Sequence, residues 1–206
     1  MKRILFALAL LGACASGTQA QLREQAIEAP ALRQLRPAVP ESRTPPAMPA
    51  RGTIQLAFTP WDDAQGMIVE GIRRARQQIL VQAYSFTSRA IANALIAARR
   101  RGVDVKVMAD REQTYGGESS RIPDLVQAGI AVVLEVRYQS AHNKVMVLDA
   151  GTADAAVITG SYNWTYAAQY KNAENLLILR DNPDIVNAYA ANWMRHYAEA
   201  LPYAEQ

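Results

Sequence analysis

From Thr53 to the C-terminus, short β-prone runs alternate with segments of helical periodicity. Short runs rich in Val, Ile and Leu fit strands, whereas apolar residues recurring at steps of three and four fit amphipathic helices. The strand-like runs cover residues 54–58, 79–86, 103–108, 130–136, 144–148, 155–159 and 176–179. This alternation predicts the α/β class, with a mixed β-sheet sandwiched by helices.

The helical segments carry recognisable start and stop signals. Ser88 is the expected cap of a helix that ends at Gly102, and a short helix is expected over residues 122–128. A helix opened by Asp62 and Asp63 contains Met67, Ile68, Gly71, Ile72, Ala75 and Ile79 at helical spacing. A last helix, opened by Asp181, Asn182 and Pro183, aligns Ile185, Val186, Tyr189, Trp193 and Tyr197. No internal repeat is evident.

The first twenty residues are typical of an export signal. Lys2 and Arg3 precede an apolar run of ten residues, which is too short to span a bilayer. Cleavage after Ala20 would give a soluble chain, whereas residues 11–14 resemble a bacterial lipobox that would place a lipid on Cys14. Both alternatives predict an exported protein, either secreted or periplasmic, or lipid-anchored to the envelope.

Residues 21–52 have a different composition. Pro30, Pro37, Pro40, Pro45, Pro46 and Pro49 fall within twenty residues that contain few large apolar side chains. Such a segment cannot bury a core and favours an extended, flexible tether. The expected organisation is therefore a signal peptide over 1–20, a tether over 21–52 and a folded domain over 53–206.

The charge is divided unevenly between these parts. The whole chain has 22 basic and 19 acidic residues, a net charge of +3, but residues 53–206 carry 15 Lys and Arg against 16 Asp and Glu, a net of −1. Any anion site in the domain must therefore be local. Cys14 is the single cysteine, which leaves no disulfide to the domain, and two histidines are too few for a multi-histidine metal site.

One stretch of the domain combines side chains suited to phosphate chemistry. His142 and Lys144 are two residues apart at the start of a strand-like run, so we expect both on one face. An ammonium group can clamp a phosphate while an imidazole attacks phosphorus or moves a proton. Asp149 ends this run, residues 160–163 (Gly-Ser-Tyr-Asn) end the next, and Glu174 begins the one after.

The pattern His142-x-Lys144-x-x-x-x-Asp149, then Gly160-Ser161-x-Asn163 and Glu174, resembles the signature of the phospholipase D superfamily, in particular its small bacterial endonuclease branch. The similarity extends over about Thr53 to Ala200, and separated positions agree in identity and order. It implies a phospholipase D/nuclease-like fold and hydrolysis of phosphodiesters.

The resemblance also assigns roles by position. It implies a catalytic set of His142, Lys144, Asp149 and Glu174, and a phosphate-binding set of Lys144, Ser161 and Asn163. His142 would form a phosphohistidine intermediate and Glu174 would orient its imidazole. Asp149 is expected to act structurally or electrostatically rather than in proton transfer.

Members of this superfamily build one active site from two such motifs, and this chain has one. His196 has no Lys two residues later and is expected to be a packing or surface residue. The resemblance therefore implies a two-fold homodimer that brings two copies of His142 together, one as nucleophile and one as acid. No metal or other cofactor is implied, because Lys144 of each copy supplies the positive charge.

The substrate stays open between several alternatives. A nonspecific endonuclease acting on DNA or RNA is the first hypothesis, a phospholipase D acting on phosphatidylcholine-type lipids the second, and an inactive binding or scaffold protein the third.

Several other side chains have two possible roles. Residues 99–101, three arginines, could bind nucleic acid or simply end a helix in solvent. Tyr84, Tyr115 and Tyr138 could stack on bases or pack, and the turn at residues 150–155 could alter a loop beside the site.

Overall fold

The computed structural model describes residues 44–117 and 119–204. The predicted signal peptide, Cys14 and most of the predicted tether lie outside these residues. The final part of that tether, residues 44–52, is exposed and forms neither helix nor strand. Residues 46–206 form one compact unit.

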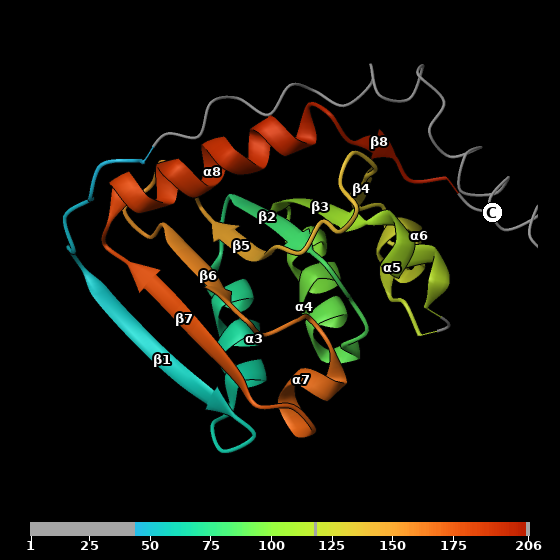
Figure 1. The fold of residues 1–206 in the computed structure, drawn as a ribbon, viewed down its shortest axis with the longest axis horizontal. Coiled ribbons are helices and arrows are strands. Elements are labelled where there is room, and N and C mark those ends of the chain that lie inside the picture. The colour runs from blue at the N-terminus through green and yellow to red at the C-terminus, as the bar shows by residue number, and fades with distance from the viewer. Residues whose placement is uncertain (1–43, 118, 205–206) are drawn as a thin grey trace, which may run out of the picture. The chain divides into compact units, whose positions relative to one another are not determined.

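The core of this unit is a single eight-stranded sheet (Figure 1). Strands β2, β3 and β4 are mutually parallel, and every other neighbouring pair is antiparallel, which confirms the predicted mixed sheet. In spatial order the strands are β1 (Thr53–Thr59), β7 (Glu174–Arg180), β6 (Ala156–Gly160), β5 (Lys144–Leu148), β2 (Gln78–Ala83), β3 (Asp104–Asp110), β4 (Ala131–Glu135) and β8 (Leu201–Pro202).

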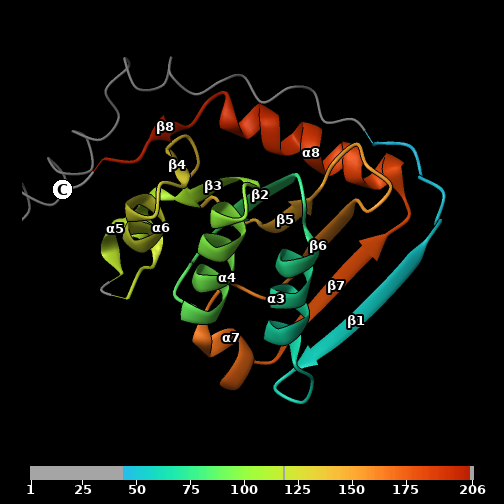
Figure 2. The same ribbon diagram turned by 180° about the vertical axis from the view of Figure 1, so that it is seen from behind.

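Helices cover both faces of the sheet. Helices α3 (Ala64–Arg74) and α4 (Arg89–Arg100) pack side by side on one face, and α8 (Pro183–Tyr197) crosses the other (Figures 1 and 2). Three shorter helices lie in the connections between strands: α5 (Arg111–Gly116) and α6 (Ile122–Gln127) between β3 and β4, and α7 (Tyr166–Tyr170) between β6 and β7. The predicted α/β sandwich is confirmed, although α5 and α7 were not predicted.

The helix starts follow from capping side chains that the sequence indicated. The side chain of Asp63 accepts a hydrogen bond from the backbone of Gly66, and that of Ser88 accepts one from Ile91. Helix α8 is capped by Asn182, whose side chain accepts from the backbone N–H of Ile185. Each cap satisfies a backbone N–H that the helix itself leaves without a partner.

Two buried clusters hold the layers together. The larger one joins the inner faces of α3 and α4 to one face of the sheet, and the smaller one joins α8 to the other face. Among the described residues, the members of both clusters fall within residues 57–203, so the unit 46–206 contains a hydrophobic core. None of the helices in the described part of the chain is both long and apolar enough to cross a bilayer.

The sheet has two ends that differ in their side chains, and we name them by one residue each. At the His142 end, Ala83 of β2 pairs with Lys144 of β5, and Thr59 of β1 pairs with Glu174 of β7. At the Asp149 end, β2 and β3 begin and β5 and β7 finish. Helices α3 and α4 begin at the His142 end and finish at the Asp149 end, because each connects the end of one strand to the start of another.

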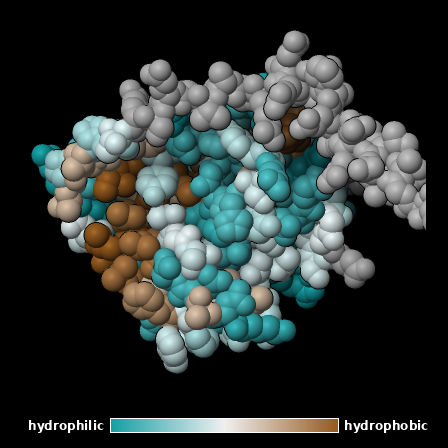
Figure 3. All heavy atoms as spheres, viewed as in Figure 1, coloured by the Kyte–Doolittle hydropathy of each residue, from teal (hydrophilic) through white to brown (hydrophobic). Residues whose placement is uncertain are grey.

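The edge strand β1 leaves an apolar surface uncovered. Its alternate residues Ile54, Leu56 and Phe58 are 50–56% exposed on the face that α8 covers elsewhere. Figure 3 shows the hydrophobic side chains gathered over β1 and β7. Trp61 follows this strand at the His142 end and is 83% exposed.

Candidate active site

His142 and Lys144 lie together at one end of the sheet, as the sequence predicts. Strand β5 begins at Lys144, so His142 belongs to the loop just before it and is exposed. The Lys144 side chain turns back along the chain, and its Nζ atom lies 2.9 Å from His142 Nδ1 and 2.7 Å from the His142 carbonyl oxygen. An ammonium group can only donate, so Nδ1 is the acceptor and a neutral ring then carries its proton on Nε2.

Tyr84 completes a three-residue cluster. It follows β2, and its backbone N–H donates to the Asn143 carbonyl oxygen at 3.0 Å, which ties the two loops together. Its ring centroid lies 4.3 Å from that of His142, and the Lys144 Nζ atom lies 4.8 Å from the centre of the Tyr84 ring. The aromatic face therefore contacts both predicted phosphate-handling groups and attracts the cation. The sequence left Tyr84 undecided between stacking and packing.

Lys144 is buried, with 6% of its surface exposed. Burial lowers the pKa of its ammonium group, and the nearby charge of Glu174 partly opposes this by favouring the cation. No carboxylate of residues 44–117 or 119–204 forms an ion pair with Lys144, and a buried cation in this state is poised to receive an anion. Lys144 thus has the position expected of a phosphate ligand.

Glu174 and Ser161 form a second group on the neighbouring strands. The Ser161 hydroxyl donates to Glu174 Oε2 at 2.5 Å, and the Asn172 side-chain amide donates to Glu174 Oε1 at 2.9 Å. Among the described residues, no hydrogen bond joins Glu174 to the His142 imidazole. The orienting role predicted for Glu174 therefore stays a prediction. The charge of Glu174 instead acts on Lys144, whose pKa it raises.

The segment after β6 brings its backbone very close to β7. Gly160 has φ +148°, and a Cβ atom there would lie 2.3 Å from the Asn175 carbonyl oxygen, so a side chain does not fit. The Ser161 Oγ atom accepts from the Asn175 backbone N–H at 3.0 Å. Ser161 is thus engaged in holding β6 to β7, in addition to the phosphate-binding role predicted for it.

Asn163 differs from Ser161 because its side-chain amide has no hydrogen-bond partner among the described residues. Its Oδ1 atom is buried without a hydrogen-bond partner, and its side chain makes no hydrogen bond within residues 44–117 and 119–204. A buried polar group of this kind is costly unless something satisfies it. A bound phosphate is one such partner, as predicted for Asn163, provided that the amide presents its N–H₂ group to the oxygen.

Asp149 does not lie with the other signature residues. It is at the far end of β5 from Lys144, a separation of roughly 16 Å for five extended residues. Its buried carboxylate accepts from the backbone N–H groups of Arg76, Gln77 and Gln78 at 2.7–2.9 Å. Asp149 cannot touch a phosphate held by Lys144. It therefore does not belong in the catalytic set, and its role is the structural one that was also expected. The 150–155 turn likewise lies at the Asp149 end, not beside the site.

Asp110 is a contributor that the sequence did not reveal. It ends β3, is 3% exposed, and its Oδ2 atom accepts from the backbone N–H of Ala141 at 2.8 Å, while Oδ1 accepts from Gln113 at the start of α5. This bond fixes the loop immediately before His142. No local pattern could have indicated it, because the partners are 31 residues apart.

His196 lies on the opposite face from Lys144. Its Nδ1 atom is 2.5 Å from Glu135 Oε1, and Gln82 donates to the other oxygen of that buried carboxylate at 3.1 Å. His196 is therefore a packing residue between α8 and β4, as expected. Trp164 is fully buried and donates from Nε1 to the Gln82 carbonyl oxygen, so it too packs.

Comparison with known proteins identifies the family to which this fold and site belong. The family described as "Cardiolipin synthase, PLD-like domain" matches residues 68–197. A phospholipase D of Rickettsia typhi is 36% identical over 149 residues, which cover 72% of this chain and 70% of that protein. A mitochondrial cardiolipin hydrolase of Xenopus laevis is 34% identical over 141 residues, covering 68% and 64%.

A solved structure agrees. The crystal structure of Nuc, a phospholipase D family member from Salmonella typhimurium, superposes with a TM-score of 0.69 at 29% identity, covering 75% of this chain and all of that one. The fold and site thus define a phosphodiester hydrolase, which sets aside the alternative of an inactive scaffold. The chain belongs to the phospholipase D superfamily, as a phospholipase D-like protein with one signature motif.

Proposed function

We propose that this protein is an exported, metal-independent endonuclease that cleaves DNA or RNA nonspecifically through a phosphohistidine intermediate on His142. The observation that carries the proposal is the openness of the site. His142 is exposed at the end of the sheet, and three further exposed aromatic side chains occupy the same end: Trp61, Tyr166 and Tyr170. Stacking on aromatic rings holds nucleobases with little sequence preference.

The proposed reaction begins with phosphate binding. A phosphate oxygen accepts from the Lys144 ammonium group, which then no longer donates to His142 Nδ1. The imidazole can now carry its proton on Nδ1, and Nε2 is left with a free lone pair. The Nε2 lone pair then forms a bond to phosphorus while the bond from phosphorus to the leaving oxygen breaks. Water later attacks phosphorus, the nitrogen–phosphorus bond breaks, and the ring is restored.

The leaving oxygen needs a proton, and a second copy of the chain would supply it. In the proposed two-fold homodimer, the partner's His142 is the cationic acid: it gives its Nε2 proton to the leaving oxygen, becomes neutral, and takes a proton back from the attacking water in the second step. In the cationic form Nδ1 also carries a proton, so the contact with the ammonium of its own lysine is released. Within the described residues, the second histidine His196 is bound to Glu135 on the other face of the sheet and is not available for this role.

A phospholipid diester is the second candidate substrate. The names of the relatives from Rickettsia typhi and Xenopus laevis favour it. The apolar surface on β1, formed by Ile54, Leu56 and Phe58, could approach acyl chains. Against it, that surface lies on the face of the sheet opposite to the Lys144 side chain.

The deciding experiment uses the unit 46–206 in excess EDTA, with plasmid DNA, RNA and phosphatidylcholine vesicles as separate substrates. We expect nicking and degradation of the nucleic acids and no choline release. His142→Ala should reduce cleavage to background with an unchanged melting temperature, because His142 is exposed. Choline release without nucleic-acid cleavage would move the assignment to the lipid.

The dimer has its own test. Wild-type and His142→Ala chains are unfolded together in equal amounts and refolded. If one site needs both copies of His142, about a quarter of the wild-type activity remains, because only one dimer in four has two intact copies. A residual activity of one half would mean that each chain works alone.

A further inference from the structure

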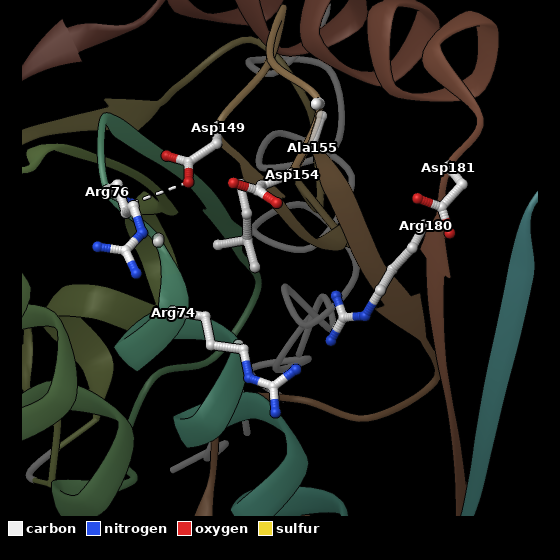
Figure 4. Close-up of a pocket in the computed structure, with 11 residues that line it drawn as sticks. Arg74, Arg76, Asp149, Asp154, Ala155, Arg180 and Asp181 are labelled. Atoms are coloured by element: carbon white, nitrogen blue, oxygen red, sulfur yellow. Dashed lines mark hydrogen bonds between the residues drawn. The ribbon is translucent and has the colours of Figure 1, made fainter.

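The Asp149 end of the unit carries a concentration of arginine side chains. Two adjoining hollows of about 240 and 290 Å³ open there, and they share Arg74 and Arg76. Five arginines line the two hollows: Arg73, Arg74, Arg76, Arg101 and Arg180. Figure 4 shows Arg74 and Arg180 extending toward each other across the hollow of about 240 Å³. We call these five residues the arginine end.

The carboxylates nearby do not neutralise this group. Four carboxylates, those of Glu70, Asp149, Asp154 and Asp181, stand against five guanidinium groups, and the oxygens of Asp149 are turned to three backbone N–H groups rather than to the arginines. Glu70 accepts from the Nε atoms of Arg73 and Arg74, which hold its pKa at about 2. The terminal NH₂ groups of those two arginines are not used in these contacts and remain available to another anion.

The arginines converge because three element ends meet. Helix α3 ends at Arg74, α4 ends at Arg100 beside Arg101, and β7 ends at Arg180. One Arg101 nitrogen donates to the carbonyl oxygens of Ile72 and Arg73 near the end of α3, which fixes the two helix ends together. The remaining donors are planar forks suited to the two oxygens of a phosphodiester.

The chain enters the unit at this same end. The side chain of Asn182, which caps α8, donates to the carbonyl oxygens of Pro49 and Arg51 at 3.0 and 3.3 Å. Residues 46–52 thus run beside the start of α8 before β1 begins (Figure 1). The described chain therefore enters the unit at the arginine end, opposite to His142.

We propose that the arginine end is a docking surface for a bilayer containing anionic phospholipid, with the phosphate groups of the lipids entering the two hollows. The charge favours a polyanionic partner, and the entry of residues 46–52 at this end favours a membrane among the polyanions, because the lipid that the lipobox alternative places on Cys14 would tether the unit from this end. Basic side chains near an anionic leaflet each add attraction that decays within a Debye length. Docking in this orientation turns His142 away from the bilayer, toward soluble substrates.

The inference goes beyond the proposed nuclease activity and does not depend on it. The test uses the unit 46–206 and vesicles of either pure phosphatidylcholine or an equal mixture of phosphatidylcholine and phosphatidylglycerol. We expect binding to the mixed vesicles alone, weakened by added salt. Arg74→Gln/Arg180→Gln should reduce the vesicle affinity on the order of thirtyfold, since it removes two cations at the surface.

The matched control is Arg111→Gln/Arg195→Gln, which removes the same charge from exposed positions at the His142 end. It should bind the mixed vesicles as the wild type does. An equal loss in both double variants would overturn the proposal, because the attraction would then depend on net charge alone. Binding of a single-stranded oligonucleotide through Arg74 and Arg180, without vesicle binding, would assign the surface to nucleic acid instead.

Orientation is tested with lipids brominated in their acyl chains, which quench nearby tryptophan fluorescence. Trp61 is exposed at the His142 end, whereas Trp164 and Trp193 are buried. We expect no quenching in the vesicle-bound state. Quenching of Trp61 would show that the apolar, aromatic end inserts, which would overturn docking through the arginine end. Diester hydrolysis by each variant, measured on the same samples, reports separately on the proposed enzyme activity.

Discussion

The Nζ atom of Lys144 lies 2.9 Å from Nδ1 of His142, and both side chains contact the ring of Tyr84. The predicted nucleophile and the predicted phosphate ligand are therefore one physical unit in the free protein. A change in the charge of one must alter the proton position on the other. The pH dependence of the enzyme should report this coupling directly.

The alkaline limit of activity should belong to Lys144. Burial lowers the pKa of its ammonium group, so the cation is lost below the ordinary value of 10.5 and phosphate binding weakens there. Lys144→Arg keeps a cation at all accessible pH values and should move the alkaline limb of kcat/KM to higher pH. An alkaline limb that stays in place in this variant would belong to another group.

The same shift predicts a dependence of stability on pH. Below the lowered pKa, the folded and unfolded chains both hold the Lys144 proton, and the cost of burying the cation is complete. Between that pKa and 10.5 the unfolded chain binds more protons, so the free energy of unfolding rises with pH. Lys144→Met should therefore be stabilised relative to wild type at neutral pH, and the difference in melting temperature should shrink as the pH is raised.

Removing the charge of Glu174 should move the alkaline limb of kcat/KM in the direction opposite to the shift expected for Lys144→Arg. Glu174 raises the pKa of Lys144 against the effect of burial, so Glu174→Gln should move the alkaline limb to lower pH. Asn172→Ala is the control, because it removes a hydrogen bond from the same carboxylate and leaves the charge. If both variants shift the limb equally, the effect comes from side-chain position rather than charge.

Full activity should require the aromatic ring of Tyr84 but not its hydroxyl group. Tyr84→Leu removes the aromatic face from Lys144 and His142, and we expect kcat/KM to fall about 3- to 30-fold, the range of a partly desolvated cation–π contact. Tyr84→Phe retains the face and should stay near wild type. Equal losses in both would point to the phenol oxygen.

Asp149 should affect stability rather than chemistry. Asp149→Ala leaves three backbone N–H groups without their acceptor and should lower the free energy of unfolding by roughly 3–5 kcal/mol. Asp149→Asn should cost less, because Asn tolerates the local φ of +47° and keeps one acceptor. The rate per folded molecule should be unchanged in the Asp149→Asn variant, which urea titration and an activity assay on the same sample can check.

Much of the layer architecture was predictable because local chemistry decides it. Asp63 and Ser88 cap the helices that follow, and the apolar stripe of α8 buries Val186 and Trp193 as expected. The helices α5 and α7 escaped prediction because they have six and five residues, too few for periodicity to register, and only the equally short α6 was expected from the sequence.

Most residues of the site could be predicted from the sequence, but the distances between them could not. The alternation of side chains and the signature placed His142 near Lys144, yet the same signature grouped Asp149 with them, although β5 separates the two by its full length. Asp110 and Tyr84 reach the site through contacts distant in the sequence, which no local spacing encodes.

The position of Asp149 has a consequence for how this sequence could diverge. A duplicated copy that no longer needed to cleave diesters could lose His142 and Lys144 without loss of its fold. It could not easily lose Asp149, because that carboxylate holds the link between α3 and β2. Descendants recruited to other tasks should therefore retain an aspartate at the end of this strand long after the histidine has gone.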